Sequence, residues 1–256
     1  MAPMSTTHAT TPPAPDAEPA VDRGLLEQRV DEVLGRLDLA AVRAGRDPHE
    51  ILVLLATKTR TPAQIAAVVE MMQDRGRRIA VGENRAQEIA KHSDPLLAHN
   101  GVPRHFIGRL QTNKARDVID FAQMIHSVDR EAIAEALERR AERAGVTREV
   151  LVQVNTSGEE SKGGFAPSAE VLAPVVQSLQ ACAHLRPVGL MTIGANTTDE
   201  PTVRASLRSL RELRDDLAVP GLVELSMGMS GDLEIAVEEG ATIVRVGSAV
   251  FGARPV

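Results

Sequence analysis

The sequence predicts an α/β protein that folds as a single (β/α)8 barrel of the TIM type. Eight apolar, strand-like runs alternate with segments of helical periodicity, beginning after about residue 20. Several runs are continuously apolar, such as Val150-Leu151-Val152, a pattern typical of parallel strands buried on both faces. With 256 residues, 43% of them hydrophobic, the chain can form one such barrel and its core. Periodicity alone leaves a doubly wound open sheet as the alternative, but no GxGxxG segment follows the first strand.

The chain opens with a segment rich in Pro, Thr and Ala. This composition predicts a disordered tail over residues 1–20, and residues 21–256 are expected to form the barrel. Apolar residues at helical spacing from Leu26 onward predict a first helix that stops near Gly45. After it, short apolar runs bounded by polar residues, Gly or Pro predict strands, with helical patterns between them. The expected strands cover residues 51–57, 78–82, 104–108, 123–128, 149–155, 186–193, 222–227 and 242–247.

Composition argues against several classes of function. Aromatic residues make up only 2% of the chain and its net charge is -6, so nucleic acid is not an expected partner. Cys182 is the one cysteine, and no HExxH spacing occurs, so neither a disulfide framework nor a metal site is expected. No apolar run reaches the roughly 18 residues of a membrane span. The N-terminus lacks an apolar signal core, so the expected compartment is the cytoplasm.

Lys58 is the first candidate for chemistry, because it ends the apolar run that begins at Ile51. The chain has 25 arginines but only four lysines, so arginine fills most cationic positions. An amine, unlike a guanidinium, can lose its proton when desolvated and form an imine with an aldehyde. A lone lysine at such a place is more often a solvated charge. The case for Schiff-base chemistry therefore depends on the residues at the other strand ends.

Polar residues follow nearly every predicted strand, and the C-terminal strand ends form the active face of a barrel. About half of these residues are expected to be only turns or helix caps. The most specific segments are the last two, Ser226–Asp232 and Arg245–Ser248, where small residues precede a helix. Such loops bind phosphate in this fold. Arg245 interrupts an apolar run, so it either pairs with a barrel glutamate or donates to the ring of a ligand.

Several motifs together resemble one protein family from about residue 25 to the end of the chain. They are Ala56-Thr57-Lys58-Thr59, Gly82-Glu83-Asn84, His105-Phe106-Ile107-Gly108 continuing to Lys114, Gly189-Leu190-Met191-Thr192, Leu225-Ser226-Met227-Gly228-Met229-Ser230, and Gly240 to Ser248. In this order and spacing they are similar to the YggS-like (PROSC) pyridoxal phosphate homeostasis proteins. The resemblance implies a barrel related to the N-terminal domain of alanine racemase, pyridoxal 5′-phosphate (PLP) as cofactor, and a monomer.

The resemblance also implies roles for individual residues. The residues implied to bind the cofactor are Lys58, Asn84, Met227, Ser230, Arg245, Gly247 and Ser248. Among them, Lys58 would hold PLP as a Schiff base, Arg245 would face the pyridine nitrogen, and Ser230 would bind the phosphate together with the last loop. His105 and the stretch from Gly108 to Lys114 belong to the family signature without an assigned role. Arg85 departs from the family, because many relatives carry Tyr there.

The chemistry of this cofactor narrows the function. An arginine opposite the pyridine nitrogen cannot give up a proton, so the ring is expected to remain a weak electron sink. Racemases of the related type use a second acid/base, a Tyr, and this chain has no tyrosine. The expectation is a non-catalytic PLP-binding protein of vitamin B6 homeostasis, which exchanges PLP with PLP-dependent apoenzymes by reversible transimination at Lys58. The alternatives are a PLP-dependent amino-acid enzyme of the racemase type and a cofactor-free, lysine-dependent aldolase.

Overall fold

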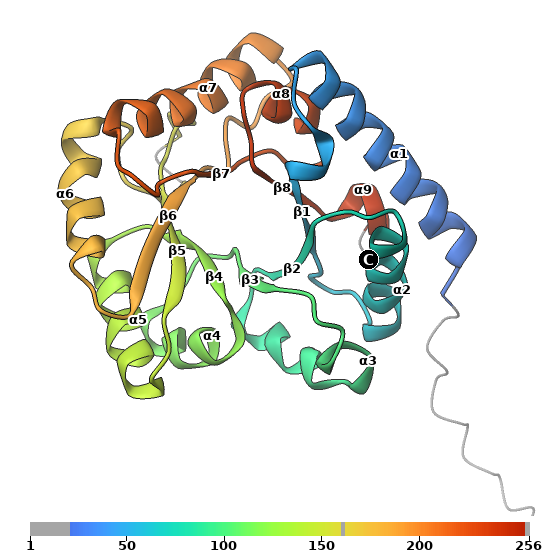
Figure 1. Cartoon of the computed structure of the whole chain (residues 1–256), viewed down its shortest axis with the longest axis horizontal. Coiled ribbons are helices and arrows are strands. Elements are labelled where there is room, and N and C mark those ends of the chain that lie inside the picture. Colours follow the sequence, from blue (N-terminus) through green and yellow to red (C-terminus); the bar gives the residue numbers. More distant parts are fainter. Residues whose placement is uncertain (1–20, 160–161, 254–256) are drawn as a thin grey trace, which may run out of the picture.

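The computed structural model describes residues 21–159 and 162–253, within which eight parallel strands close into one barrel (Figure 1). Each strand pairs with its neighbours in sequence, and the last pairs with the first. The strands are β1 (Leu52–Ala56), β2 (Ile79–Glu83), β3 (Arg104–Phe106), β4 (Met124–Val128), β5 (Arg148–Gln153), β6 (Leu185–Met191), β7 (Glu224–Ser226) and β8 (Ile243–Val246). The predicted barrel is confirmed. The open-sheet alternative is wrong, because closure leaves no edge strand.

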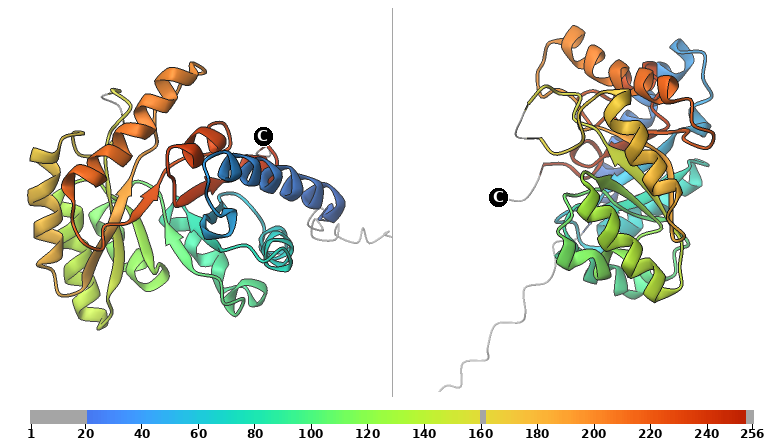
Figure 2. Two further views of the ribbon diagram at one scale, coloured as in Figure 1. Left: turned by 45° about the horizontal axis from the view of Figure 1, so that its top comes forward. Right: turned by 90° about the vertical axis from the view of Figure 1, so that its left-hand side faces the viewer.

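Helices surround the barrel, and α1 packs across α2, α8 and α9 on one side of it (Figures 1 and 2). The α-helices described are α1 (Arg23–Arg43), α2 (Pro62–Asp74), α3 (Pro95–Ala98), α4 (Ala115–Phe121), α5 (Glu131–Ala144), α6 (Ala169–Gln180), α7 (Glu200–Leu217), α8 (Leu233–Glu238) and α9 (Ser248–Phe251). Short 3-10 helices are η1 (Pro48–Glu50), η2 (Ala86–Ser93) and η3 (Thr112–Lys114). The predicted tail, residues 1–20, lies outside the described residues.

Local sequence explains where the first helices begin and end. The side chain of Asp22 caps α1 by accepting a hydrogen bond from a backbone N–H in the first turn. Gly45 follows α1 with a φ of +66°, at the predicted stop. Thr61 and Gln64 form a reciprocal capping box at the start of α2. These contacts set both ends of α1 and the start of α2, the two α-helices before and after β1 in the chain.

Three strands end two residues earlier than the sequence predicts. Strand character is expected through residues 108, 155 and 193, but β3 ends at Phe106, β5 at Gln153 and β6 at Met191. The residues beyond these points leave the sheet and form loops at the C-terminal rim of the barrel. The apolar character of the sequence therefore continues past the strand ends into the loops, where Ile107 packs against the interior core and Ile193 is exposed.

Two apolar cores result from the closed barrel. The larger one lies between the strands and the surrounding helices. The smaller one fills the barrel interior with Leu54, Ala80, Met124, Leu151, Val188, Met191 and Ile243. The interior also holds buried polar side chains, namely His105, His126, Ser226 and Arg245. Buried polar groups need partners, so these residues mark the part of the barrel where a site is expected.

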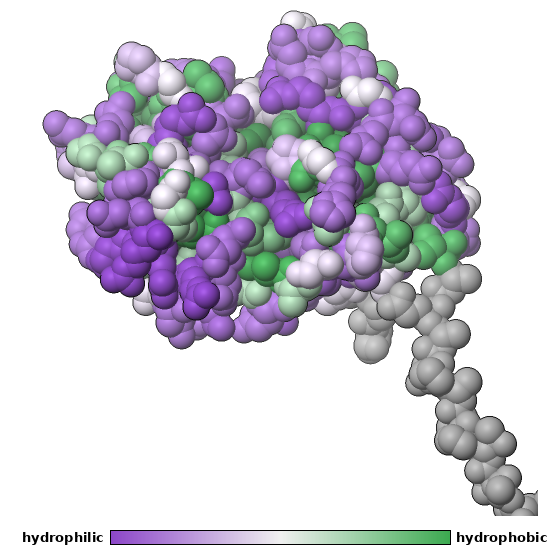
Figure 3. All heavy atoms as spheres, turned by 60° about the horizontal axis from the view of Figure 1, so that its bottom comes forward, coloured by the Kyte–Doolittle hydropathy of each residue, from purple (hydrophilic) through white to green (hydrophobic). Residues whose placement is uncertain are grey.

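The helices, the acidic and metal-ligating side chains and the surface add little to what the barrel indicates about function. Among the described residues, no helix combines the length and the apolar character needed to cross a membrane. In the same part of the chain, no group of three or more His, Cys, Asp or Glu residues could hold a metal ion. Hydrophilic side chains dominate the face in Figure 3, with hydrophobic residues in small groups among them.

Candidate functional site

Lys58 lies just beyond the C-terminal end of β1. Side chains alternate between the two faces of a strand, and Leu52 and Leu54 pack in the barrel interior. Thr57 continues the opposite face, because its hydroxyl donates a hydrogen bond to Glu83 Oε1 outside the barrel at 2.5 Å. The alternation therefore directs the half-buried Lys58 toward the mouth of the barrel.

The residue before Lys58 is held by a buried carboxylate. Glu83 is fully buried, and its Oε1 lies 2.8 Å from Lys91 Nζ and 2.8 Å from His92 Nε2. The same ammonium of Lys91 donates to the backbone oxygen of Thr57 at 2.7 Å. Both the backbone and the side chain of Thr57 are thus tied to β2 and η2. This arrangement restricts the position of the next residue, Lys58.

The residue after Lys58 has an unusual backbone conformation. Thr59 has a φ of +64°, in the left-handed region that costs a residue with a Cβ about 1–2 kcal/mol. Its N–H donates to Glu88 Oε2 at 3.0 Å, and Lys91 Nζ donates to the same oxygen at 2.8 Å. Burial opposes ionisation of Glu88, but the hydrogen bonds from Lys91 and Thr59 outweigh it and lower the pKa of this carboxyl. Strained residues persist where surrounding contacts over-determine them, and they cluster at functional sites.

Arg245 is buried within β8 and crosses the barrel interior. Its side chain donates from Nη1 to Ser226 Oγ at 2.7 Å and from Nη2 to the backbone oxygen of Thr192 at 2.8 Å. Burial lowers the pKa of Arg245 to about 10, so the guanidinium is still charged at neutral pH. Among the described residues, no carboxylate lies within salt-bridge distance of it. The predicted alternative, a structural ion pair with a barrel glutamate, is therefore wrong.

The loops after β7 and β8 meet at the same end of the barrel. The hydroxyls of Ser230 and Ser248 lie 3.5 Å apart, and Ser230 Oγ accepts a hydrogen bond from the N–H of Ala249 at 3.3 Å. A Cβ on Gly247 would lie 3.3 Å from the backbone oxygen of Ala56, two residues before Lys58. These loops therefore form a cradle of small residues directly beside the end of β1.

Glycine is required at one position of this cradle. Gly228 has a φ of +88°, and a Cβ there would lie 2.3 Å from the Cβ of Ala236 in α8. The loop can therefore turn tightly against the helix only with glycine. Arg36 of α1 fixes the other side of the loop by donating to the backbone oxygen of Ser230 at 3.0 Å.

Asn84 follows β2 at the rim, and the loop that begins at Gly108 packs against it. A Cβ on Gly108 would lie 1.9 Å from the backbone oxygen of Asn84, so glycine is obligatory at this contact. The side-chain Oδ1 of Asn84 is buried and accepts no hydrogen bond within the described residues. A buried acceptor without a donor is unfavourable by about 1–3 kcal/mol. A ligand hydroxyl or N–H at this point would supply the donor.

The structure brings most of the predicted site residues together, with one exception. Those at the C-terminal mouth of the barrel are Lys58, Asn84, Ser230, Arg245, Gly247 and Ser248. Met227 is fully buried, and its side chain packs in the outer core between the strands and the helices. Any contribution of Met227 to a ligand site would therefore come from its backbone.

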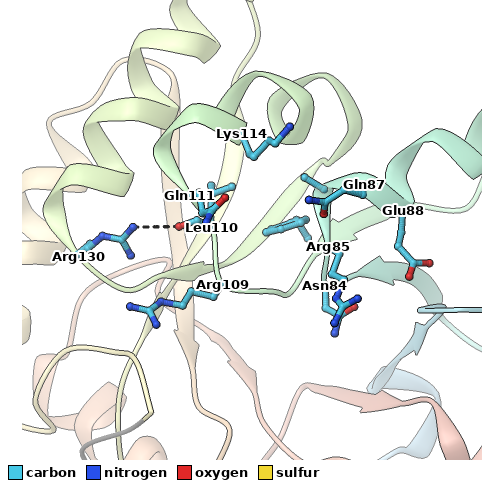
Figure 4. A pocket seen from close by; sticks show the side chains of 11 residues that line it. Asn84, Arg85, Gln87, Glu88, Arg109, Leu110, Gln111, Lys114 and Arg130 are labelled. Atoms are coloured by element: carbon cyan, nitrogen blue, oxygen red, sulfur yellow. Dashed lines mark hydrogen bonds between the residues drawn. The ribbon is translucent and has the colours of Figure 1, made fainter. Parts of the chain in front are cut away.

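A cationic pocket of about 690 Å³ adjoins the mouth of the barrel (Figure 4). Asn84 and Arg85 line one wall, and Arg109, Leu110 and Gln111 line the opposite one. The charged residues of the lining are Arg85, Glu88, Arg109, Lys114 and Arg130. Because four of these five side chains are cations, the pocket would attract an anionic ligand toward the mouth of the barrel.

Comparison with known proteins agrees with this geometry. Residues 38–255 match the family described as alanine racemase, N-terminal domain. A Pseudomonas aeruginosa protein is 41% identical over 230 residues, covering 90% of this chain and 96% of the relative. An Aquifex aeolicus protein is 40% identical over 230 residues, covering 89% and 97%. Both relatives are named pyridoxal phosphate homeostasis protein. This chain belongs to the pyridoxal phosphate homeostasis family.

Solved structures of similar proteins share the barrel. An unknown protein from Bifidobacterium adolescentis is 38% identical, with a TM-score of 0.82 over 91% of this chain and 98% of that one. PipY of Synechococcus elongatus PCC7942, with PLP bound, is 31% identical, with a TM-score of 0.71 over 86% and 100%. The family membership that the sequence motifs indicated is therefore confirmed. The roles of individual site residues remain predictions.

Some residues around the site were not predicted from sequence. Glu83 and Lys91 hold the segment that carries Lys58, and His126 lies beside Ser226 inside the barrel. Lys91 was detectable in principle, since it is one of only four lysines. His126 also left a signal, because it interrupts the apolar run of β4.

Proposed function

We propose that this protein binds PLP at the mouth of the barrel and serves in the homeostasis of this cofactor. The observation that carries the proposal is the position of Lys58. It is directed to the mouth of the barrel, beside the cradle of Ser230 and Ser248 and above the buried guanidinium of Arg245. The PLP-bound structure of PipY, 31% identical to this chain, supports the assignment of the cofactor.

When bound, PLP supplies an aldehyde that reacts reversibly with amines and a pyridine ring that can withdraw electrons. We propose that the amine of Lys58 condenses with this aldehyde as a Schiff base and releases one water. The contacts of Thr57 and Thr59 with Lys91 and Glu88 hold the lysine in place for this reaction. Pre-ordering the amine reduces the entropy lost on binding.

The two ends of the cofactor would meet different residues. Ser230, Gly247 and Ser248 would bind the phosphate through hydroxyl and backbone groups, because small residues let the backbone approach an anion closely. Asn84 would accept a hydrogen bond from a hydroxyl of the cofactor, which satisfies its buried Oδ1. Met227 would contribute only backbone, since its side chain faces the outer core.

Arg245 would face the ring nitrogen and limit catalysis. With its pKa at about 10 the guanidinium keeps its proton at neutral pH, so it donates a hydrogen bond without transferring the proton. A ring that stays unprotonated withdraws electrons weakly, which favours storage of the cofactor over chemistry on amino acids. The relatives named as homeostasis proteins rather than enzymes support this view.

Exchange of the cofactor would occur through the open rim. The pocket beside Asn84 leaves one side of the mouth accessible to an incoming amine. We propose that the holoprotein, a cytoplasmic monomer, delivers PLP to PLP-dependent apoenzymes by transient contact. Reversible bonding at Lys58 allows such transfer, because each step exchanges one amine for another.

The proposal is tested by loading purified protein with PLP, recording the visible absorption band, and reducing with borohydride before peptide mapping. The modified residue should be Lys58. Lys58→Arg should abolish the adduct while keeping the charge, and the matched variant Lys114→Arg should not. Absence of the band, or modification of another lysine, would contradict the proposal. Rapid exchange of amino-acid α-protons in D2O would favour the racemase-type alternative instead.

A further inference from the structure

Four buried polar side chains form a continuous line across the barrel interior. Arg245 Nη1 donates to Ser226 Oγ at 2.7 Å, Ser226 Oγ lies 2.9 Å from His126 Nδ1, and His126 Nε2 lies 3.0 Å from His105 Nδ1. The residues come from β8, β7, β4 and β3. All four residues are buried, with exposed fractions of 6%, 0%, 0% and 4% in the order Arg245, Ser226, His126 and His105.

The chemistry of the donors decides which atom donates and which accepts in each hydrogen bond of this line. A guanidinium only donates, so Ser226 Oγ must accept from Arg245. The single hydroxyl proton of Ser226 is then best donated to Nδ1 of His126. A neutral His126 accepting at Nδ1 carries its proton on Nε2, and this proton points to Nδ1 of His105. His105 in turn keeps its proton on Nε2.

The opposite direction satisfies fewer groups. If His105 donated from Nδ1 to His126 Nε2, then His126 would donate from Nδ1 to Ser226 Oγ. That oxygen would accept twice, and the hydroxyl proton of Ser226 would have no acceptor within the line. A buried donor without a partner is unfavourable, so the first direction is preferred.

Both imidazoles are held neutral by their surroundings. Burial lowers the pKa of His105 to about 4. Burial lowers the pKa of His126 well below its usual value, and the nearby His105 and Arg245 add to the effect. A protonated His126 would lose the acceptor at Nδ1 that Ser226 requires. Neutrality and the direction of the line therefore support each other.

We propose that His126 is a positioning residue for the cofactor. Acting through Ser226, it fixes the plane of the Arg245 guanidinium, whose second nitrogen is fixed by the backbone oxygen of Thr192. His105 accepts the Nε2 proton of His126 and so stabilises this tautomer, which gives a role to this signature histidine. The inference rests on the proposed function, because it concerns the contact of Arg245 with the cofactor ring. It predicts that the electronic environment of the ring depends on a histidine that does not touch it.

The first measurement needs no cofactor. Long-range 1H–15N correlation spectra of the apoprotein at neutral pH should show His105 and His126 both neutral and both protonated on Nε2. A proton on Nδ1 of His126, or a charged ring, would overturn the inference. This outcome is independent of whether PLP binds, so it separates a failure of the inference from a failure of the proposed function.

The second measurement uses PLP as the probe. His126→Leu removes both nitrogens, and Ser226→Ala removes the link to Arg245. Each should shift the visible band of PLP bound at Lys58, make it vary with pH, and weaken PLP binding roughly tenfold through loss of an oriented charged donor. His126→Asn, which can keep an acceptor near Ser226, should restore the wild-type band.

Controls keep this test decisive. Met124→Leu, two residues earlier in β4 and inside the same barrel, should leave the band unchanged. Circular dichroism and urea unfolding identify a variant that fails to fold, and the other variant then carries the test. If a folded His126→Leu or Ser226→Ala protein binds PLP with the wild-type band and affinity, the positioning role is wrong.

Discussion

The ammonium of Lys91 donates to the backbone oxygen of Thr57, the residue before Lys58, at 2.7 Å. The same ammonium lies 2.8 Å from Oε1 of the fully buried Glu83. One lysine therefore neutralises a buried carboxylate and fixes the segment that carries another lysine. This relationship links the stability of the barrel to the position of the proposed cofactor bond.

Replacing Lys91 by Met should destabilise the protein and also release the backbone of Thr57, next to Lys58. Removing one partner of a buried ion pair leaves an uncompensated charge, here on Glu83, and costs about 3–5 kcal/mol. Urea unfolding measures this loss. The double variant with Glu83→Gln should recover part of the stability, because the orphaned charge is gone. Equal stability of the single and double variants would show that the pair is not coupled.

Alanine at Gly228 should disrupt the cradle. The new Cβ would lie 2.3 Å from the Cβ of Ala236, and the φ of +88° is unfavourable for alanine, so we expect a loss of about 1–3 kcal/mol. Gly231→Ala, in the same loop, meets no atom within 4 Å and is the matched control. Binding should fall more for PLP than for pyridoxal, which lacks the phosphate. An equal fall for both would place the phosphate elsewhere.

The buried histidines should make the free energy of unfolding depend on pH between the folded and the unfolded pKa values of histidine. His105 has its pKa lowered to about 4 in the folded protein, whereas an unfolded histidine has about 6.5. The unfolded chain therefore binds more protons in this window, and the free energy of unfolding falls as pH drops from about 6.5 to about 4. For His105 alone the loss is roughly 3 kcal/mol.

Urea unfolding at a series of pH values measures this dependence. His105→Gln should flatten the curve between about pH 4 and 6.5, where the histidine contribution lies. His49, which is exposed, provides a control, and His49→Gln should leave the curve unchanged. A wild-type curve that is flat across this window would mean that the barrel histidines are not held neutral.

Reversing charges in the pocket beside the mouth should slow the arrival of PLP. Arg85→Glu and Arg109→Glu convert cations on opposite walls into anions, so a phosphate-bearing ligand is no longer attracted. We expect the association rate constant to fall roughly three- to tenfold at low salt, with little effect at high salt. Stopped-flow absorbance measures the association rate constant at low and at high salt. Arg186→Glu, on β6 away from the pocket, is the control.

Sequence reasoning succeeded where the signal is local. The ends of β1, β7 and β8 could be located from apolar runs that stop on Lys58 or on small residues. Met227 illustrates a limit, because membership of a motif does not reveal which face of the chain a side chain occupies. Alternation from Ser226, which lies inside the barrel, places Met227 outside it.

The sequence by itself determined the barrel class, the family, and the candidate lysine with its phosphate-binding loops. These features depend on periodicity and on residues adjacent in the chain. Only the tertiary structure decided which polar groups meet inside the barrel. His126 and Ser226 are 100 positions apart, and their contact exists because strand register and closure bring β4 and β7 across one interior. The physical reason is that hydrogen bonds between distant strands are set by the closed geometry, which no local pattern encodes.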